Sequence, residues 1–178
     1  KLKDNVDTMI VVPNDRLLEV VDRRTTMPEA LKKADEVLQQ GVSGIVNLIN
    51  CAGLINLDFA DVQTVMKNQG IAHFGIGHGM GEDRCMIAVE QAISSPLLET
   101  SIEGARQAII NFTGDITLME AQEASDYLNQ LLGNEANIIF GAVQDDNMQE
   151  EVLITVIATG LDEDNQTEKP MPRKADYR

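Results

Sequence analysis

Hydrophobic positions along the chain follow two patterns. Short apolar runs are typical of strands, and longer segments with an apolar residue every three or four positions are typical of helices with one buried face. The runs at 6–12, 71–77, 106–113, 137–143 and 151–159 predict strands. The segments at 16–21, 28–50, 59–67, 82–94 and 118–132 predict helices.

The longest helical segment, 28–50, follows a Thr-Thr-Met-Pro sequence that is typical of a helix start. At 1.5 Å per residue it would extend roughly 35 Å, which is enough to cross a domain. Gly41 and Gly44 lie inside it. They either weaken the helix locally or let another segment approach it closely.

The body of the chain, 71–160, therefore orders as strand, helix, strand, helix, strand, strand. This order indicates an α/β or α+β layer with helices packed on a sheet. The acidic turn after Val143 leaves open that the last two strands form an antiparallel pair. Residues 162–178 are polar and without periodicity, so we expect a disordered tail there.

Composition and charge exclude several kinds of binding partner and cellular setting. The formal net charge of −15 argues against nucleic acid and against an anionic membrane surface. No apolar run approaches the roughly 18 residues of a membrane helix, and we expect no signal peptide. Cys51 and Cys85 lack metal-ligand spacing, as expected for reduced thiols of a cytosolic protein. Because the chain opens directly on a strand pattern, we expect a piece of a larger protein.

The strongest local motif is the segment 56–62, Asn-Leu-Asp-Phe-Ala-Asp-Val. If Asp58 caps the predicted helix, Asp61 lies in its first turn and both carboxylates share one face. Spacing alone favours a helix cap and an acid stabilised by the helix dipole. The functional alternative is a pair of outward carboxylates that orients a water molecule or binds a cation.

The glycine-rich segment 75–81 invites a dinucleotide-binding interpretation, but its third glycine is missing at the required spacing. Glu82 and Asp83 follow it and would repel an anion. We therefore expect a tight strand-to-helix turn here. His73 and His78 have no partners at metal-ligand spacing, and we expect non-metal roles for both.

Four segments, taken in chain order, carry a family resemblance: 11–18 (VVPNDRLL), 53–62 (GLINLDFADV), 92–102 (AISSPLLETSI) and 156–160 (VIATG). They resemble FtsZ, the tubulin-like GTPase family that polymerises at the bacterial division site. The similarity covers about residues 5–161 in unbroken order.

The resemblance implies an organisation in which 1–26 are a remnant of the N-terminal GTPase domain and 27–51 a long central helix. Residues 52–70 would form the synergy loop and its helix, and 71–161 the FtsZ/tubulin C-terminal domain, a mixed four-stranded sheet with packed helices. Residues 162–178 would be the tail. The Gly-rich phosphate loop of the family is not found in this sequence.

The resemblance also implies roles for particular residues. Asp58 and Asp61 would polarise the attacking water in the GTP site of the next subunit, with Asn56 supporting the loop near the γ-phosphate. Asn14 and Asp35 would reach the guanine base, and Leu31 stands where the family often stacks an aromatic side chain on that base.

The implied cofactors are GTP, held mostly by the N-terminal domain, and the Mg²⁺ that accompanies it. The implied partners are further FtsZ subunits in head-to-tail filaments, and membrane tethers and division proteins that dock on a C-terminal peptide not recognisable here. The expected location is the cytoplasm at the division site. The chain alone is expected not to hydrolyse GTP. The alternative is a non-catalytic assembly or protein-binding module on the same fold.

Overall fold

The computed structural model describes residues 2–12, 25–50, 53–55, 57–94, 101–133, 136–145 and 147–161. Asn14, Asn56, the predicted helix 16–21 and the predicted tail 162–178 lie outside the described residues.

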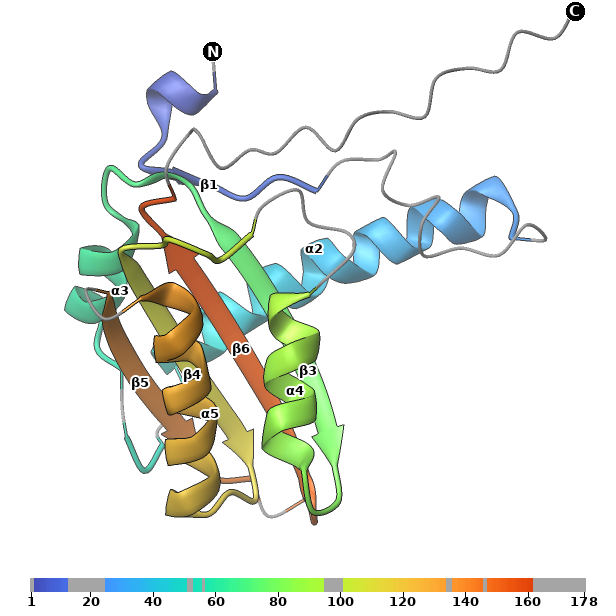
Figure 1. Cartoon of the computed structure of the whole chain (residues 1–178). Helices are drawn as coiled ribbons and strands as arrows, with labels where there is room; N and C mark the ends of the chain where they lie inside the picture. The colour runs from blue at the N-terminus through green and yellow to red at the C-terminus, as the bar shows by residue number, and fades with distance from the viewer. Residues whose placement is uncertain are drawn as a thin grey trace, which may run out of the picture.

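Short η1 (Lys3–Asn5) and β1 (Thr8–Met9) precede the long helix of the chain (Figure 1). The remaining elements, in order, are α2 (Met27–Asn50), α3 (Phe59–Met66), β2 (Gly70–Ile71), β3 (His73–Met80), α4 (Arg84–Ile93), β4 (Gln107–Gly114), α5 (Leu118–Leu132), β5 (Asn137–Val143) and β6 (Glu151–Thr159). The predicted mixed α/β fold with a four-stranded sheet is confirmed.

The main sheet has the strand order β3-β6-β4-β5. Strand β6 runs antiparallel to both of its neighbours, whereas β4 and β5 are parallel. The antiparallel pair of the last two strands, left open by the sequence, does not form because β4 lies between them. Burial follows this order: the central strand β6 is buried along most of its length, while the edge strand β5 is less buried.

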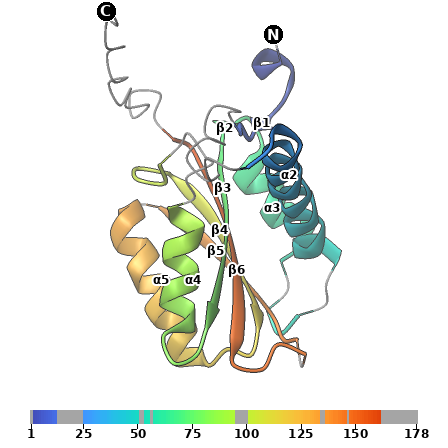
Figure 2. The same cartoon turned by 90° about the vertical axis from the view of Figure 1, so that its right-hand side faces the viewer.

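Helices cover both faces of the sheet, as the edge-on view in Figure 2 shows. On one face α4 and α5 pack over a core that includes Val89, Leu128 and Ile110. On the other face α2 and α3 pack over a second core that includes Val65 and Ile109. Neighbouring residues of β4 thus point to opposite cores, as the two-residue period of a strand requires.

The predicted strand 6–12 is much shorter than expected. Only Thr8 and Met9 pair, in parallel with Gly70 and Ile71 of β2. Because β2 offers only two residues before β3 begins, the rest of the apolar run has no ladder to join there, and Ile10 packs against the core beneath α3 instead. The predicted strand 71–77 is likewise divided between β2 and β3.

The predicted turn at 75–81 is also wrong. Gly75, Gly77 and Gly79 belong to strand β3, and only Gly81, with φ of 84°, lies in the turn before α4. A spacing of two places the three strand glycines on one face. A Cβ atom at any of them would lie 1.7–1.8 Å from a backbone oxygen of α4. These glycines therefore let helix α4 pack directly on the strand backbone.

Candidate functional site

The candidate site is built on the N-terminal end of α3, where Asp58 is the N-cap. The backbone N–H of Asp61 donates to Oδ1 of Asp58 at 2.8 Å, and the backbone N–H of Asp58 donates to Oδ2 of Asp61 at 3.2 Å. This reciprocal capping box satisfies two backbone donors at the start of the helix. The predicted cap and the predicted first-turn acid are both confirmed.

Both carboxylates nevertheless remain at the surface. Asp58 is exposed and Asp61 is half-buried. The capping box uses one oxygen of each group, Oδ1 of Asp58 and Oδ2 of Asp61. The positive end of the helix dipole favours their negative charge. Such a pair can accept hydrogen bonds from a water molecule or bind a cation, but it repels a phosphate group.

The loop before the acid pair is fastened to the edge strand β5. Ile55 and Ala142 exchange two backbone hydrogen bonds, of 3.1 Å and 3.0 Å, in an isolated antiparallel bridge. Leu57 is buried against Gly141, where a Cβ atom would lie 2.7 Å from the leucine side chain. Sequence reasoning missed these contacts, because Leu57 and Gly141 are far apart in the chain.

The segment around the acid pair also exposes large apolar side chains. Leu54 is 70% exposed and Phe59 is 61% exposed. Leu54 lies in the loop fastened to β5, and Phe59 is the first residue of α3. The segment that carries the two carboxylates therefore also exposes two large apolar side chains.

The C-terminal end of α3 is also tied down. The hydroxyl of Thr159, in β6, donates to the backbone oxygen of Val65 at 2.6 Å. The hydroxyl of Thr8, in β1, donates to the backbone oxygen of Met66. Local sequence patterns could not predict these bonds, since the two residues of each bond lie 94 and 58 positions apart in the chain.

The residues predicted to contact guanine do not join the acid pair in one copy of the chain. Leu31 and Asp35 are exposed and lie one helical turn apart on α2. The N-terminal half of α2 carries both and projects beyond the sheet on the side away from α3 (Figure 1). Asn14 and Asn56 lie outside the described residues.

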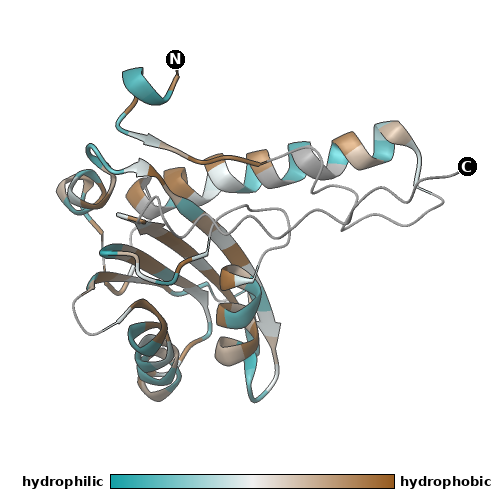
Figure 3. Ribbon diagram, turned by 45° about the horizontal axis from the view of Figure 1, so that its top comes forward, coloured by the Kyte–Doolittle hydropathy of each residue, from teal (hydrophilic) through white to brown (hydrophobic). Residues whose placement is uncertain are grey.

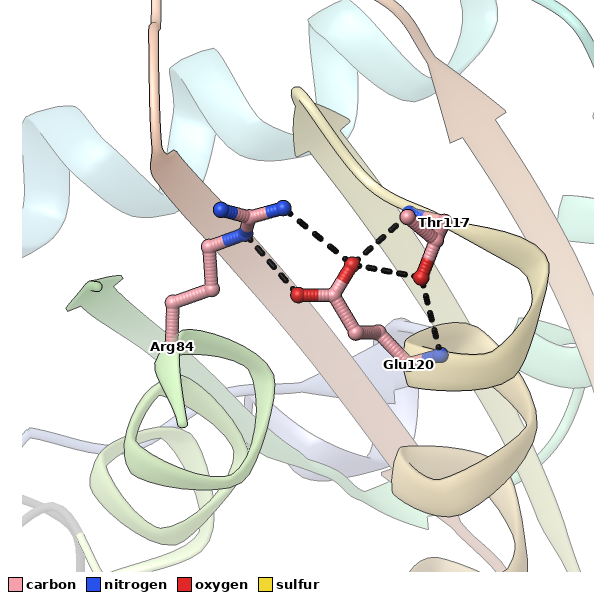
Figure 4. A network of polar contacts seen from close by, with 3 residues as sticks. All are labelled: Arg84, Thr117 and Glu120. Atoms are coloured by element: carbon pink, nitrogen blue, oxygen red, sulfur yellow. Dashed lines mark hydrogen bonds and ion pairs between the residues drawn. The ribbon is translucent and has the colours of Figure 1, made fainter. Parts of the chain in front are cut away.

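A second polar cluster joins α4 to α5 on the opposite face of the sheet (Figure 4). Arg84 Nε lies 3.1 Å from Glu120 Oε1, and its terminal nitrogen donates to Oε2 at 3.2 Å. Thr117 caps α5 and donates its backbone N–H to Glu120 Oε2 at 2.8 Å. Partial burial raises the pKa of Glu120, but the hydrogen bonds from Thr117 and the charge and hydrogen bond of Arg84 outweigh it and lower the pKa overall.

Cys85 is not suited to act as a catalytic nucleophile. Its side chain is buried, and burial, followed by the nearby charge of Glu120, raises the pKa of the thiol to about 11. Thiolate is therefore scarce at neutral pH. Within the described residues, no group of three or more His, Cys, Asp or Glu side chains is arranged to hold a metal ion. The helices of the described part include none with the length and apolarity needed to span a membrane.

Comparison with known proteins defines the class of this fold. Protofilaments of Bacillus thuringiensis serovar israelensis TubZ match with a TM-score of 0.69 at 13% identity, over 86% of this chain and 42% of that one. CetZ from Methanosaeta thermophila matches with a TM-score of 0.69 at 17% identity, over 88% of this chain and 44% of that one. These likenesses show the tubulin-like fold.

A narrower identification follows from closer matches. Residues 70–162 match the model of the FtsZ family, C-terminal domain. An empty FtsZ dimer from M. jannaschii is 44% identical, with a TM-score of 0.79, over 89% of this chain and 47% of that one. The chain belongs to the FtsZ family. It spans about half the length of the FtsZ chains that it matches.

Proposed function

We propose that this chain is the C-terminal half of a polymerising FtsZ GTPase and that Asp58 and Asp61 complete the GTP hydrolysis site of the adjacent subunit. The observation that carries the proposal is the acid pair itself. In a chain of the FtsZ family, a capping box holds two carboxylates at the surface, in a segment that also exposes Leu54 and Phe59. Within such a protein the chain would serve cell division in the cytoplasm.

An exposed apolar stripe on α2 supports the view that another part of the protein covers this helix. The stripe consists of Leu31, Leu38, Val42, Val46 and Ile49, all at least 38% exposed. At 100° per residue these positions lie on one face. Figure 3 shows apolar segments along the projecting helix. We propose that the nucleotide-binding half of the FtsZ chain covers this stripe.

In the proposed mechanism, Asp58 and Asp61 accept hydrogen bonds from the attacking water and increase its nucleophilicity, and Asn56 supports the loop. GTP and its Mg²⁺ would supply the phosphoryl group and neutralise its developing charge. Asn14 and Asp35 would bind the guanine base of the subunit's own nucleotide, beside Leu31. The two carboxylates do not bind the phosphate group themselves, because like charges repel. Another part of the protein must hold the phosphate near them.

Head-to-tail assembly would account for this division of labour. In one copy α3 and the N-terminal half of α2 lie apart, and in the proposed mechanism the acids therefore act on a nucleotide held by another copy. Exposed Leu54 and Phe59 beside the acids are suited to an interface that is closed by apolar contact. The FtsZ match described as a dimer supports self-association.

The test is phosphate release from GTP by a whole FtsZ chain that contains these 178 residues. We expect Asp61→Asn to lower turnover by about 10²-fold or more, the typical contribution of positioned acid–base groups. GTP binding and sedimentable polymer should remain. The isolated 178-residue chain should release no phosphate, and mixing it with a separately made N-terminal half should restore release.

Two further variants separate catalysis from helix capping. Asp58→Asn keeps an N-cap of equal quality but removes the carboxylate, so a large loss of turnover would be chemical rather than structural. Thr117→Ala removes the cap of α5 at a cost of about 0.5–2 kcal/mol and should leave turnover unchanged. Full turnover in either aspartate variant would contradict the proposal.

The second candidate function is a non-catalytic assembly or protein-binding module. The capping box favours it, since it gives both carboxylates a structural role. In that case Asp58→Asn and Asp61→Asn would change stability and polymer formation no more than Thr117→Ala does, and turnover would follow the amount of polymer.

A further inference from the structure

We propose that Thr8 is a positioning residue for the acid pair. The segment Asp7–Met9 clasps the C-terminal end of α3 and thereby fixes the direction in which the helix presents Asp58 and Asp61. We call the contacts between residues 7–9 and 66–72 the α3 clasp. This inference rests on the proposed function, because it assigns the clasp an effect on GTP turnover.

The bond from Thr8 to Met66 is the first part of the clasp, and it satisfies a backbone group at the end of a helix. The last four backbone carbonyls of a helix have no partner inside it. Two carbonyls at the end of α3 are bound by threonine hydroxyls, Val65 by Thr159 and Met66 by Thr8. Thr159 comes from the central strand of the main sheet, whereas Thr8 comes from the N-terminal segment. The helix end is therefore held between two separate parts of the chain.

The second part of the clasp is the turn that follows α3. The backbone oxygen of Asp7 accepts from the N–H groups of Gln69, at 2.9 Å, and Gly70, at 3.0 Å. Its carboxylate accepts from the N–H of Asn68 at 3.2 Å. Asn68 has a φ of 57°, a left-handed conformation that asparagine adopts more readily than most residues and that turns the chain from α3 toward β2.

Pairing of β1 with β2 completes the clasp. Thr8 and Met9 run parallel to Gly70 and Ile71, and the N–H of Ala72 donates to the backbone oxygen of Met9 at 3.0 Å. Thr8 thus sits at the centre of the clasp, with its backbone in this ladder and its hydroxyl on the end of α3.

The length of α3 explains how a contact at one end reaches the other. Eight residues form a rod of about 12 Å, so a tilt at Met66 moves the capping box at Asp58 by a comparable angle. A displacement of about 1 Å in a catalytic group costs about 10² in rate. Loss of the Thr8 hydroxyl should therefore lower turnover while leaving nucleotide binding and assembly in place.

The experiment compares three variants of the whole FtsZ chain that contains these residues. Thr8→Val removes the hydroxyl at nearly constant shape, Thr8→Ser restores it, and Thr64→Val is the matched control. Thr64 donates to the backbone oxygen of Ala60 at 2.8 Å, so the control breaks a bond of the same kind within α3. Turnover at saturating GTP, the KM for GTP, polymer mass and melting temperature are measured for each.

We expect Thr8→Val to lower turnover about tenfold per unit of polymer, with the KM unchanged, and Thr8→Ser to restore it. Thr64→Val should retain turnover. Hydrogen exchange at residues 68–72 should become faster in Thr8→Val alone. Unchanged turnover, or unchanged exchange at these residues, would overturn the inference.

Asp61→Asn in the same assay distinguishes the two proposals. If Asp61→Asn loses turnover and Thr8→Val does not, the proposed function stands and the clasp has no positioning role. If Asp61→Asn keeps full turnover, the proposed function fails and the positioning role fails with it.

Discussion

At the scale of single residues, the glycines of β3 decide how closely two layers approach. Gly75, Gly77 and Gly79 leave no room for a Cβ atom beneath α4. Gly41, in α2, is different, because a Cβ atom there would make ordinary contact with Phe74 at 3.7 Å. The same substitution should therefore have opposite effects at the two kinds of position.

We expect Gly77→Ala to destabilise the chain by about 3 kcal/mol, since helix and strand backbones must separate to admit the methyl group. Gly41→Ala should stabilise it by about 0.5–1 kcal/mol through the higher helix propensity of alanine. Urea unfolding followed by circular dichroism measures both. Equal midpoints for the two variants would mean that α4 is not packed on the strand backbone as described.

At the scale of elements, the chain uses the same capping device on both faces of the sheet. Asp58 with Asp61 begins α3, and Thr117 with Glu120 begins α5. The second box has an additional ion pair to Arg84 that joins α5 to α4. Glu120 therefore stabilises both a helix start and a helix–helix contact, whereas the carboxylates of the first box are at the surface.

The lowered pKa of Glu120 predicts a pH dependence of stability. A carboxyl group whose pKa is lower in the folded state contributes stability above its unfolded pKa, near 4.5, and that contribution is lost as the pH falls through the folded pKa. Glu120→Gln should destabilise the chain by about 1–2 kcal/mol at pH 7. The difference in melting temperature from the parent chain should shrink below pH 4.5. A constant difference from pH 7 to pH 3 would show that the charge of Glu120 has no part in it.

At the scale of the whole molecule, α2 leaves a long apolar stripe exposed along one face. Its apolar stripe includes Leu38, 56% exposed, and Val42, 66% exposed. The opposite side of the same helix packs on Phe74 and Thr155 through Gly44. A helix that is apolar on more than one side is typical of a buried helix, so we expect the stripe to be covered in a whole FtsZ chain.

Leu38→Ala tests whether a further part of the protein covers the stripe. In the isolated 178-residue chain we expect a change in unfolding free energy within about 0.5 kcal/mol, as for a surface position. In a whole FtsZ chain the same substitution should cost about 2–5 kcal/mol, as in a core. Urea unfolding of both proteins gives the comparison, and equal effects would leave the stripe uncovered in the complete protein.

Much of the fold and part of the candidate site could be predicted from local pattern. The bounds of α5, β5 and β6 agree with the prediction, and α2 begins one residue earlier than expected. The cap at Asp58 and the position of Asp61 were also correct. Predictions failed at β1 and at the β3 glycines, where apolar runs and glycines have more than one local interpretation and only the packing partner distinguishes them.

The sequence by itself determined most of the elements, the cap at Asp58 and the family, because helical bonds and caps join residues at most four positions apart and family motifs are continuous. Only the tertiary structure decided the central place of β6, the seating of α4 on the β3 glycines and the bond from Thr8 to Met66. These features join residues distant in the chain. They depend on which helix and strand faces pack against each other, and the local sequence pattern does not specify this.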